Sequence, residues 1–350
     1  MQDHLASLLG SPDPYGRQLD GLGGGISSLS KADLMDGPFA DIQYTFFQVG
    51  VTDGLLDMSG NCGNLTSAVG PAAIDAGLLD AHLEDPRTRV TFRLLNLNTN
   101  QVIQSTFSVS RPESQPGAPW RFEPRGNFTM PGVAGTGSEI TLRWLSPGGS
   151  KTTAALPTGR PLDQVEVEGQ NYNVSLVDVS NPGIFISGAD LGWDPARNPD
   201  ELDAQPNLME KLEVIRRKGA AMMGLDPDKP SIPKIVLVYR PRSAETHIDC
   251  QALSMGKAHK AVPGTLALNL GAACQMPGSV PNQLARASTT NKISIGHPTG
   301  FAEVGAKVTN GQEVEYVEIS RTARCLMEGV ALAAPSNYQC TPIPQGQMAE

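Results

Sequence analysis

Cys62 is the residue whose neighbours most clearly indicate chemistry. It stands in the segment SGNCGN (59–64), and an apolar stretch follows. The spacing predicts a helix that begins at Asn64 or Leu65, which would put the thiol at the N-terminal end of that helix. The helix dipole and the unpaired N–H groups stabilise a thiolate there, and they would also bind a carboxylate. On local sequence alone, a buried structural thiol is an equally good interpretation.

A second candidate lies upstream, in the segment DGLGGGISSLSK (20–31). Three consecutive glycines followed by serines predict a pliable loop whose N–H and hydroxyl groups can hold carboxylate oxygens. The segment lacks the GK[ST] arrangement of a phosphate loop. Lys31 closes the loop and is a surface lysine in the simplest interpretation. It becomes a candidate base only where burial or neighbouring cations favour its neutral form.

Cationic and polar residues flank a second predicted helix. The segment SMGKAHKAVPGTLALNLGAACQM (254–276) is expected to begin this helix at Gly264 and Thr265. Lysine, arginine and histidine bind carboxylates through charge-assisted hydrogen bonds, so the flanking cations are candidates for a rim around an anionic substrate. A histidine that is hydrogen bonded within a turn is an equally good interpretation of the two histidines. The candidates for the rim are Lys257, His259, Arg321 and Arg324, and His297, in the turn GHPTG (296–300), is a candidate for a substrate contact.

Composition disfavours several functions. The 350 residues carry a net charge of −9 and their 27 Lys and Arg are scattered, so nucleic acid is not an expected partner. Prolines and asparagines interrupt the uncharged stretch 261–285, so we expect no membrane span. The five cysteines are widely spaced and lack a CxxC pair, which disfavours a disulfide framework and a metal site. With no visible signal peptide, these features predict a cytoplasmic protein.

Several familiar catalytic motifs do not occur in the sequence. Without GxSxG, HExxH and GxGxxG, a serine hydrolase, a zinc peptidase and a dinucleotide enzyme are disfavoured. What remains is one thiol, one amine and many groups that bind carboxylates. This combination suits proton transfer next to a carboxylate, with no cofactor and no metal.

Strand-like alternation and two glycine-led helices predict an α+β fold in which one pattern occurs twice. We expect an N-terminal domain over 1–152, a C-terminal domain over 153–332 and a polar tail over 333–350, and leave open whether the last strands return to the first domain. Small residues suit a helix enclosed by a sheet. One helix is predicted within 198–224, with Leu208, Leu212, Ile215 and Met222 on its apolar face, and strands are predicted across 313–333.

Six segments, taken together, resemble the 2-methylaconitate isomerase (PrpF-type) family, which includes aconitate, 4-oxalomesaconate and methylitaconate isomerases. They occur in the family's order and span about Asp3 to Leu332. The segments are GSPDPYGRQLDGLGGGISSLSK (10–31), SGNCGNLTSAVGPAAI (59–74), LPTG (156–159), SMGKAHKAVPGT (254–265), GHPTG (296–300) and SRTARCLMEG (320–329).

The resemblance implies the diaminopimelate-epimerase-like fold, with two pseudo-symmetric domains, each a sheet curled around a central helix, and an active site in the cleft between them. It implies a cofactor-independent isomerase of small unsaturated di- or tricarboxylic acids, acting by cis/trans isomerisation or by a 1,3-allylic shift. Lys31 and Cys62 take the positions of the catalytic pair, and which of them removes the first proton stays open. The expected substrate contacts are Ser27, Ser28, Ser30, Asn61, Gly63, Asn64, Asn181, Lys257, His259, Gly264, Thr265, His297, Thr299 and Arg321.

Departures from the family pattern bear on function. The second cysteine of the related epimerases would fall on Pro263, so two-thiol racemisation is not expected. Lys260 stands where relatives often have a histidine, which bears on substrate choice. The chain begins after the point where we expect a strand with an RGGTSKG-like segment, so a carboxylate contact and one strand are expected to be missing. A catalytically weak binding protein therefore stays an alternative, and the assembly, a homodimer included, stays open.

Overall fold

The described chain divides into two compact units. The computed structural model describes residues 2–18, 20–22, 27–35, 38–79, 87–115, 117–130, 133–194 and 198–332. Unit 1 comprises Met1–Lys31, Thr45–Met58 and Cys325–Glu350, and unit 2 comprises Ala32–Tyr44 and Ser59–Arg324. The predicted glycines 23–25 and the predicted tail 333–350 lie outside the described residues. The predicted domain boundary at 152/153 stays a prediction.

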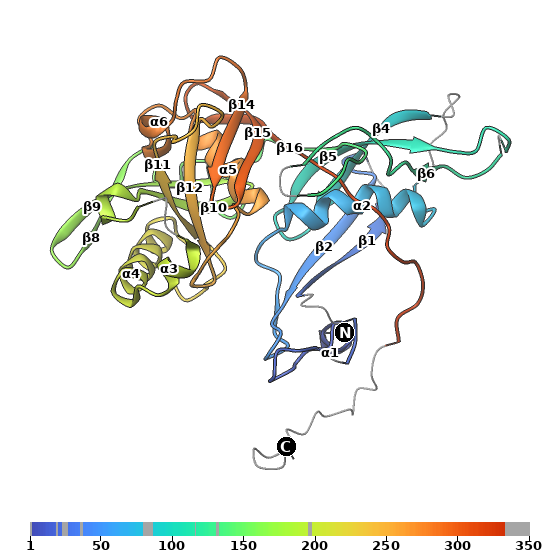
Figure 1. Ribbon diagram of the computed structural model, residues 1–350, viewed down its shortest axis with the longest axis horizontal. Coiled ribbons are helices and arrows are strands. Elements are labelled where there is room, and N and C mark those ends of the chain that lie inside the picture. Colours follow the sequence, from blue (N-terminus) through green and yellow to red (C-terminus); the bar gives the residue numbers. More distant parts are fainter. Residues whose placement is uncertain are drawn as a thin grey trace, which may run out of the picture. The chain divides into compact units, whose positions relative to one another are not determined.

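Strands outnumber helices along the chain (Figure 1). The helices are α1 (Gln2–Leu8), α2 (Gly63–Asp75), the 3₁₀ helix η1 (Ala189–Leu191), α3 (Pro199–Asp203), α4 (Pro206–Met222), α5 (Gly264–Ala273) and α6 (Val280–Leu284). The strands are β1 (Ser28–Leu34), β2 (Ile42–Val49), β3 (Leu56–Asp57), β4 (Arg87–Asn96), β5 (Gln101–Ser110), β6 (Arg121–Phe122), β7 (Ile140–Leu145), β8 (Asp163–Val167), β9 (Gln170–Val179), β10 (Asn181–Ser187), β11 (Lys234–Tyr239), β12 (Ile248–Ser254), β13 (Lys257–Ala258), β14 (Lys292–His297), β15 (Gly300–Thr309) and β16 (Glu313–Arg321). The predicted α+β class is confirmed.

Unit 1 is built around a small apolar cluster. Ala6 and Leu9 pack with Val49 at the end of β2, and the partly buried Leu29 and Leu56 lie against them. The backbone of β1 is held to this cluster because the carbonyl of residue 27 accepts hydrogen bonds from the N–H of Val49 (2.7 Å) and from the side chain of residue 48 (2.7 Å). The first residues of β1 are thereby fixed within unit 1.

A continuous sheet carries the elements of unit 2. The neighbouring strands follow the order β2-β4-β5-β7-β16-β15-β14-β12-β11-β10-β9-β8. Strand β16 is antiparallel to both of its neighbours: Ile319 lies opposite Leu142 of β7 and opposite Val304 of β15. Alternation of apolar residues decides which face of a strand is buried. In β5, for example, Ile103 and Phe107 are completely buried.

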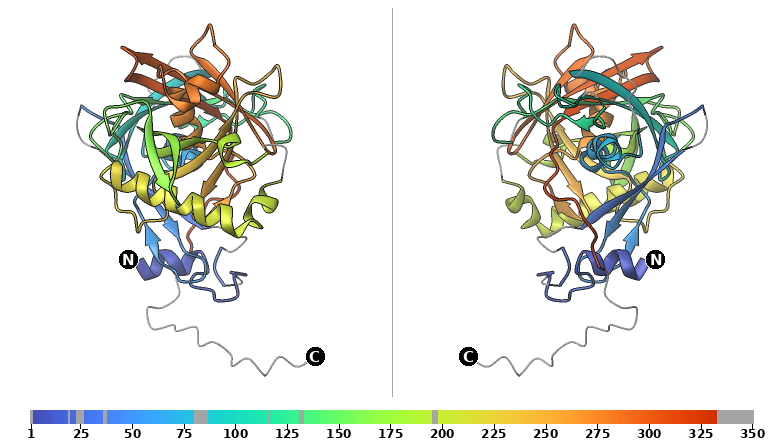
Figure 2. Two further views of the ribbon diagram at one scale, coloured as in Figure 1. Left: turned by 90° about the vertical axis from the view of Figure 1, so that its left-hand side faces the viewer. Right: turned by 90° about the vertical axis from the view of Figure 1, so that its right-hand side faces the viewer.

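Two helices pack against this sheet with their small residues inward. Helix α2 lies against β4, β5, β6 and β7, and α5 lies against β9, β10, β14, β15 and β16; the right-hand view of Figure 2 looks along α2. All ten residues of α5 are buried. A Cβ atom on Gly271 would lie 2.5 Å from Val304 Cγ2, and one on Gly70 of α2 would lie 2.7 Å from Phe107 Cε1. Glycine is therefore required where each helix approaches the sheet.

Three expectations about local structure are wrong. The segment 198–224 forms α3 and α4 rather than one helix, because Pro206 pushes the preceding Gln205 out of the helical region (φ −108°, ψ 81°). Ser28 and Ser30, which were predicted to lie in a loop, belong to strand β1 instead, since the strand is stabilised by pairing with β2. The final strand ends at Arg321 rather than near 333. Its pairing with β7 ends there, because Arg321 lies opposite Ile140, the first residue of β7.

The predicted helix starts and the predicted apolar face of α4 are confirmed. Helix α2 begins at Gly63, within two residues of the predicted start, and α5 begins at Gly264 as predicted. On α4, Leu212 and Ile215 are buried, and Leu208 and Met222 are partly buried against the same cluster. In the part of the chain that the structure describes, no helix is long and apolar enough to cross a membrane.

Candidate active site

Cys62 lies at the N-cap of α2, as its sequence context predicts. Its backbone is extended (φ −111°, ψ 110°), its thiol is partly exposed and its side chain makes no capping hydrogen bond. The first intrahelical bond runs from the N–H of Thr66 to the carbonyl of Cys62 (3.0 Å). The N–H groups of residues 63–65 precede this bond, so they have no partner within the helix. The thiol therefore stands beside the positive end of α2.

A buried ring of hydrogen bonds holds the backbone of Cys62. Its N–H donates to Asn61 Oδ1 (2.8 Å), and its carbonyl accepts from Thr66 Oγ1 (2.9 Å). Asn61 Nδ2 donates to the hydroxyl of Tyr44 (3.1 Å), which lies 2.8 Å from Thr66 Oγ1. Tyr44, Asn61 and Thr66 are 1 %, 7 % and 0 % exposed. The side chain of Asn61 is thus engaged with protein groups on both of its polar atoms.

The N-terminus of α5 lies against that of α2. A Cβ atom on Gly63 would lie 3.6 Å from the backbone nitrogen of Thr265 and 3.8 Å from Gly264 Cα. The N-cap of α5 is Pro263, which has no side chain able to accept a hydrogen bond. Two positive helix ends therefore meet without a side-chain cap on either. An anion between them would be stabilised by both helices.

Arg321 adds a full positive charge to this junction. Its Nε donates to Asn64 Oδ1 (3.2 Å), and a Cβ atom on Gly264 would lie 3.2 Å from its Nη2. Burial lowers the pKa of the guanidinium, and the charge of Cys62 acts in the opposite direction. An arginine stays protonated under all ordinary conditions. The end of β16 therefore delivers a permanent cation to the N-termini of both helices.

Asn181 completes the junction from the β9–β10 turn. It is 2 % exposed, and its Nδ2 lies 3.5 Å from Thr265 Oγ1. Its Oδ1 is buried and has no hydrogen-bond partner, and it lies 3.8 Å from the position of a Cβ atom on Gly60. Ser180, which has a positive φ of 58°, donates from its hydroxyl to the carbonyl of Thr265 (3.1 Å). The strained turn thus fixes Asn181 beside both helix starts.

The histidine and lysine candidates have mainly local contacts. Lys257 is exposed at the β12–β13 turn, and the backbone N–H of His259 donates to Ala252 (2.8 Å). His297 Nδ1 lies 3.4 Å from Thr299 Oγ1, in the turn that joins β14 to β15. Burial lowers the pKa of His297, and a hydrogen bond to the backbone of residue 301 opposes this shift. Their contact with substrate stays a prediction.

The upstream candidates belong to unit 1. Ser28, Ser30 and Lys31 lie on β1, directly after Ser27. Lys31 is exposed, and the hydroxyl of Ser30 is buried without a hydrogen-bond partner. The structure therefore groups Ser28, Ser30 and Lys31 on one strand, rather than in the loop that their spacing predicted. Their pairing with Cys62 of unit 2 stays a prediction.

Two polar residues that act on the site candidates, Tyr44 on the backbone of Cys62 and Lys234 on His259, were not identified from the sequence. Tyr44 stands in IQYTFFQV, where alternation marks it only as a core residue of a strand. Lys234 begins β11 and donates to the carbonyl of Ser231 (2.8 Å), whose hydroxyl lies 2.9 Å from that of Ser59. Desolvation first, and the charge of Lys234 second, lower the pKa of His259. No local motif distinguishes either residue, because Tyr44 contacts Asn61 and Thr66, and Lys234 influences His259, across many positions of sequence.

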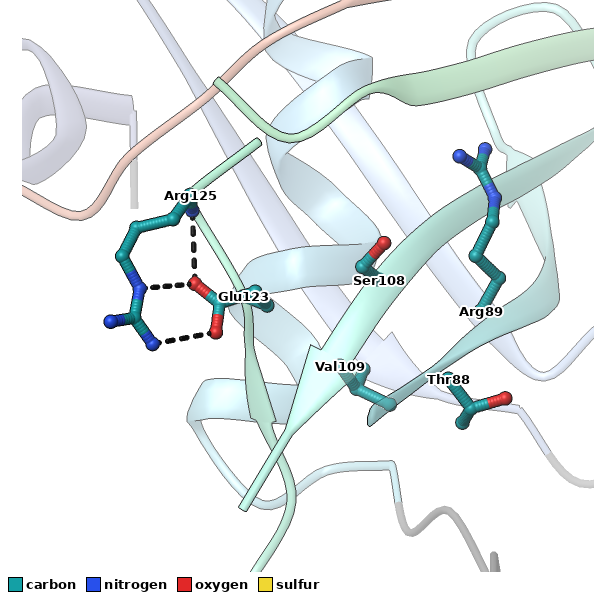
Figure 3. Close-up of a pocket in the computed structure, with 6 residues that line it drawn as sticks. All are labelled: Thr88, Arg89, Ser108, Val109, Glu123 and Arg125. Atoms are coloured by element: carbon teal, nitrogen blue, oxygen red, sulfur yellow. Dashed lines mark hydrogen bonds and ion pairs between the residues drawn. The ribbon is translucent and has the colours of Figure 1, made fainter. Parts of the chain in front are cut away.

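A surface hollow elsewhere in unit 2 does not serve as this site. It has a volume of about 560 Å³ and lies on β4, β5 and the segment after β6 (Figure 3). Its charges are already paired: Arg125 binds Glu123 through two contacts of 2.8 and 2.9 Å, and Arg89 lies 3.4 Å from Glu139. Because these pairs neutralise each other, the hollow offers less to an anion than the helix junction does.

Among the described residues, no group of three or more His, Cys, Asp or Glu side chains is placed to hold a metal ion.

The comparisons with known proteins agree with the resemblance drawn from the sequence. A family model described as PrpF protein matches residues 2–333. The 2-methyl-aconitate isomerase of Shewanella oneidensis is 35% identical, in a match that covers 93% of this chain and 87% of the relative.

Two further relatives carry other isomerase names. The (4E)-oxalomesaconate Delta-isomerase of a Novosphingobium species is 32% identical, over 93% of this chain and 88% of the relative. The crystal structure of a methylitaconate-delta-isomerase is 31% identical, with a TM-score of 0.76 over 93% of this chain and 87% of the solved one. These matches extend over nearly the whole length of both chains.

Proposed function

Because the chain belongs to the PrpF family, we propose that it is a cofactor-independent isomerase that interconverts cis and trans forms of aconitate or 2-methylaconitate. The family membership and the isomerase names of its relatives support this activity. The observation that carries the choice of substrate class is the junction of the two uncapped helix N-termini. Cys62, Arg321 and Asn181 lie around it, and such a site favours a substrate with more than one carboxylate.

The proposed reaction begins with removal of a proton from the carbon allylic to the double bond. The resulting dienolate spreads its charge into a carboxylate, and the N–H groups of the helix starts stabilise that charge. In the intermediate the former double bond is partly single, so it rotates before the proton returns. Lys31 and Cys62 share the acid and base roles in this proposal. Return of the proton to the same carbon gives the geometric isomer.

Turnover of defined acids tests the proposal. Purified protein, assayed without added cofactor or metal, is expected to interconvert cis- and trans-aconitate, and proton NMR in deuterated buffer should show exchange at the allylic carbon. The Cys62→Ser and Lys31→Ala variants should each lose about 100-fold or more in kcat, the size of a general acid–base contribution. Cys325→Ser, which changes an exposed cysteine, and Lys218→Ala, which removes a lysine bound to the carbonyl of residue 166, are the matched controls and should keep full activity.

A 1,3-allylic double-bond shift is the second candidate, since two relatives are named Delta-isomerases. Return of the proton to the distal carbon would give this outcome from the same dienolate. Methylitaconate and oxalomesaconate in the same screen distinguish the two, because the position of the double bond in the product differs. Tight binding of several acids without turnover would instead identify a binding protein on this fold, and full activity of both Cys62→Ser and Lys31→Ala would contradict the mechanism.

A further inference from the structure

We propose that Tyr44 is a positioning residue for Cys62: its buried hydroxyl, held between Asn61 and Thr66, keeps the first turn of α2 in the geometry that presents the thiol. The proposal rests on the proposed function of Cys62, but it concerns a residue of another element, β2. Tyr44 is 1 % exposed, and in this proposal it acts through its hydrogen bonds with Asn61 and Thr66.

The donors and acceptors of the ring can be assigned. A backbone carbonyl only accepts, so the hydroxyl of Thr66 is the donor in its 2.9 Å bond to Cys62. The hydroxyl of Tyr44 must then donate to Thr66 Oγ1, and it accepts from Asn61 Nδ2. The amide of Asn61 is fixed in turn, because its Oδ1 accepts the N–H of Cys62. Each member therefore sets the orientation of the next.

The backbone N–H and the backbone carbonyl of Cys62 are both hydrogen bonded to members of this ring. Removal of the Tyr44 hydroxyl would leave Asn61 Nδ2 without a partner in a site from which water is excluded, and Thr66 Oγ1 would lose the donor that holds it while keeping its contacts with Cys62 and Asn61. The amide of Asn61 would then be free to turn away from the N–H of Cys62. The N-cap geometry, and with it the position of Sγ at the helix end, would lose its support.

The hydroxyl keeps its proton at any pH that an assay would use. Burial raises the pKa of Tyr44 far above its ordinary value, and the charge of Cys62 acts in the same direction. The hydrogen bonds of Tyr44 with Thr66, Asn61 and Asn96 only partly offset this shift. A phenol that never ionises is a dependable donor, which is what a positioning role requires.

The test uses Tyr44→Phe, which removes the hydroxyl oxygen and keeps the buried aromatic side chain. We expect kcat to fall by about 10-fold with KM within about twofold of wild type. We also expect the rate of alkylation of Cys62 by iodoacetamide, followed on the Cys62 peptide by mass spectrometry without substrate, to fall by about threefold or more. Thr66→Val should repeat both effects, and Thr66→Ser, which keeps the hydroxyl, should retain near-wild-type values.

The matched control is Tyr172→Phe. Tyr172 of β9 is 4 % exposed, and its hydroxyl donates to Gln170 Oε1 (2.9 Å) and accepts from Lys211 (3.4 Å). The Tyr172→Phe variant removes the same hydroxyl from a comparably buried tyrosine, so it should leave kcat and the alkylation of Cys62 unchanged. Alkylation of Cys62 in Tyr44→Phe at or above the wild-type rate would overturn the proposal. Because alkylation needs no turnover, this result stays separate from failure of the isomerase assay.

Discussion

At the scale of single residues, the junction depends on one permanent cation. Arg321 is the last residue of β16, and it is tied to the first turn of α2 through Asn64. Its other hydrogen bond goes to the carbonyl of residue 320 (3.1 Å), so it has no carboxylate among these partners to neutralise it. The charge is therefore available to a carboxylate of the substrate.

We predict that Arg321→Met raises KM for an aconitate-type acid by about 10- to 100-fold, the effect of losing a hydrogen bond to a charged group. The variant should fold, since the site is partly exposed. Arg321→Lys should recover only part of the loss, because an ammonium cannot form a bidentate pair. Steady-state kinetics give the measurement, and Arg125→Met, on the hollow of Figure 3, is the control. An unchanged KM in Arg321→Met would remove Arg321 from the site.

At the scale of elements, small residues decide how closely the helices approach the sheet. Gly70 lies in the middle of α2, where glycine weakens a helix by about 1 kcal/mol relative to alanine. It is tolerated because a Cβ atom there would lie 2.7 Å from the ring of Phe107 and 3.0 Å from Ser105 Oγ. Close packing of α2 on β5 thus outweighs helix propensity. This packing sets the position of α2, and of Cys62 at its N-cap, relative to the sheet.

Gly70→Ala is predicted to lower the free energy of unfolding by about 1 kcal/mol, because overpacking exceeds the gain in helix propensity. Urea denaturation followed by circular dichroism gives the value. Gly117→Ala is the control, since a Cβ atom there would meet no neighbour within 4 Å, and it should stay within about 0.5 kcal/mol of wild type. A stabilised Gly70→Ala variant would contradict the packing described for α2.

At the scale of the whole molecule, β16 joins the strands around α2 to the strands around α5. It pairs with β7 on one side and with β15 on the other, so the sheet of unit 2 is continuous between the two helices. Leu142, completely buried in β7, lies opposite Ile319 of β16 and Ser105 of β5. Because the hydrogen bonding between strands is continuous from β7 through β16 to β15, we expect the stability of α2 and the stability of α5 to be coupled.

We therefore expect Leu142→Ala to lower the free energy of unfolding by about 2–5 kcal/mol, the usual loss for a buried leucine. Hydrogen exchange followed by mass spectrometry should show reduced protection in α5 as well as in α2, although it is α2 that packs against β7, the strand of Leu142. Leu97→Ala, at a position that is 49% exposed, should change neither. Loss of protection confined to α2 would show that the two parts of the sheet unfold separately.

The sequence by itself determined the features that depend on neighbours along the chain. The glycine-led starts of α2 and α5, the position of Cys62 at a helix end and the alternating strands follow from local spacing and backbone preference, and the ordered motifs indicated the family. Local spacing also misled where pairing or a proline dominated, as in β1 and at Pro206.

Only the tertiary structure decided which groups meet at the site. The contact of Gly63 with Gly264, and the bond between Asn64 and Arg321 across 257 positions of sequence, depend on strand pairings that no local pattern encodes. The same holds for Tyr44, which reads in sequence as an ordinary core residue and is set by β2 against the first turn of α2. Local spacing predicts an element, whereas the partners of a buried polar group are chosen by the packing of elements against one another.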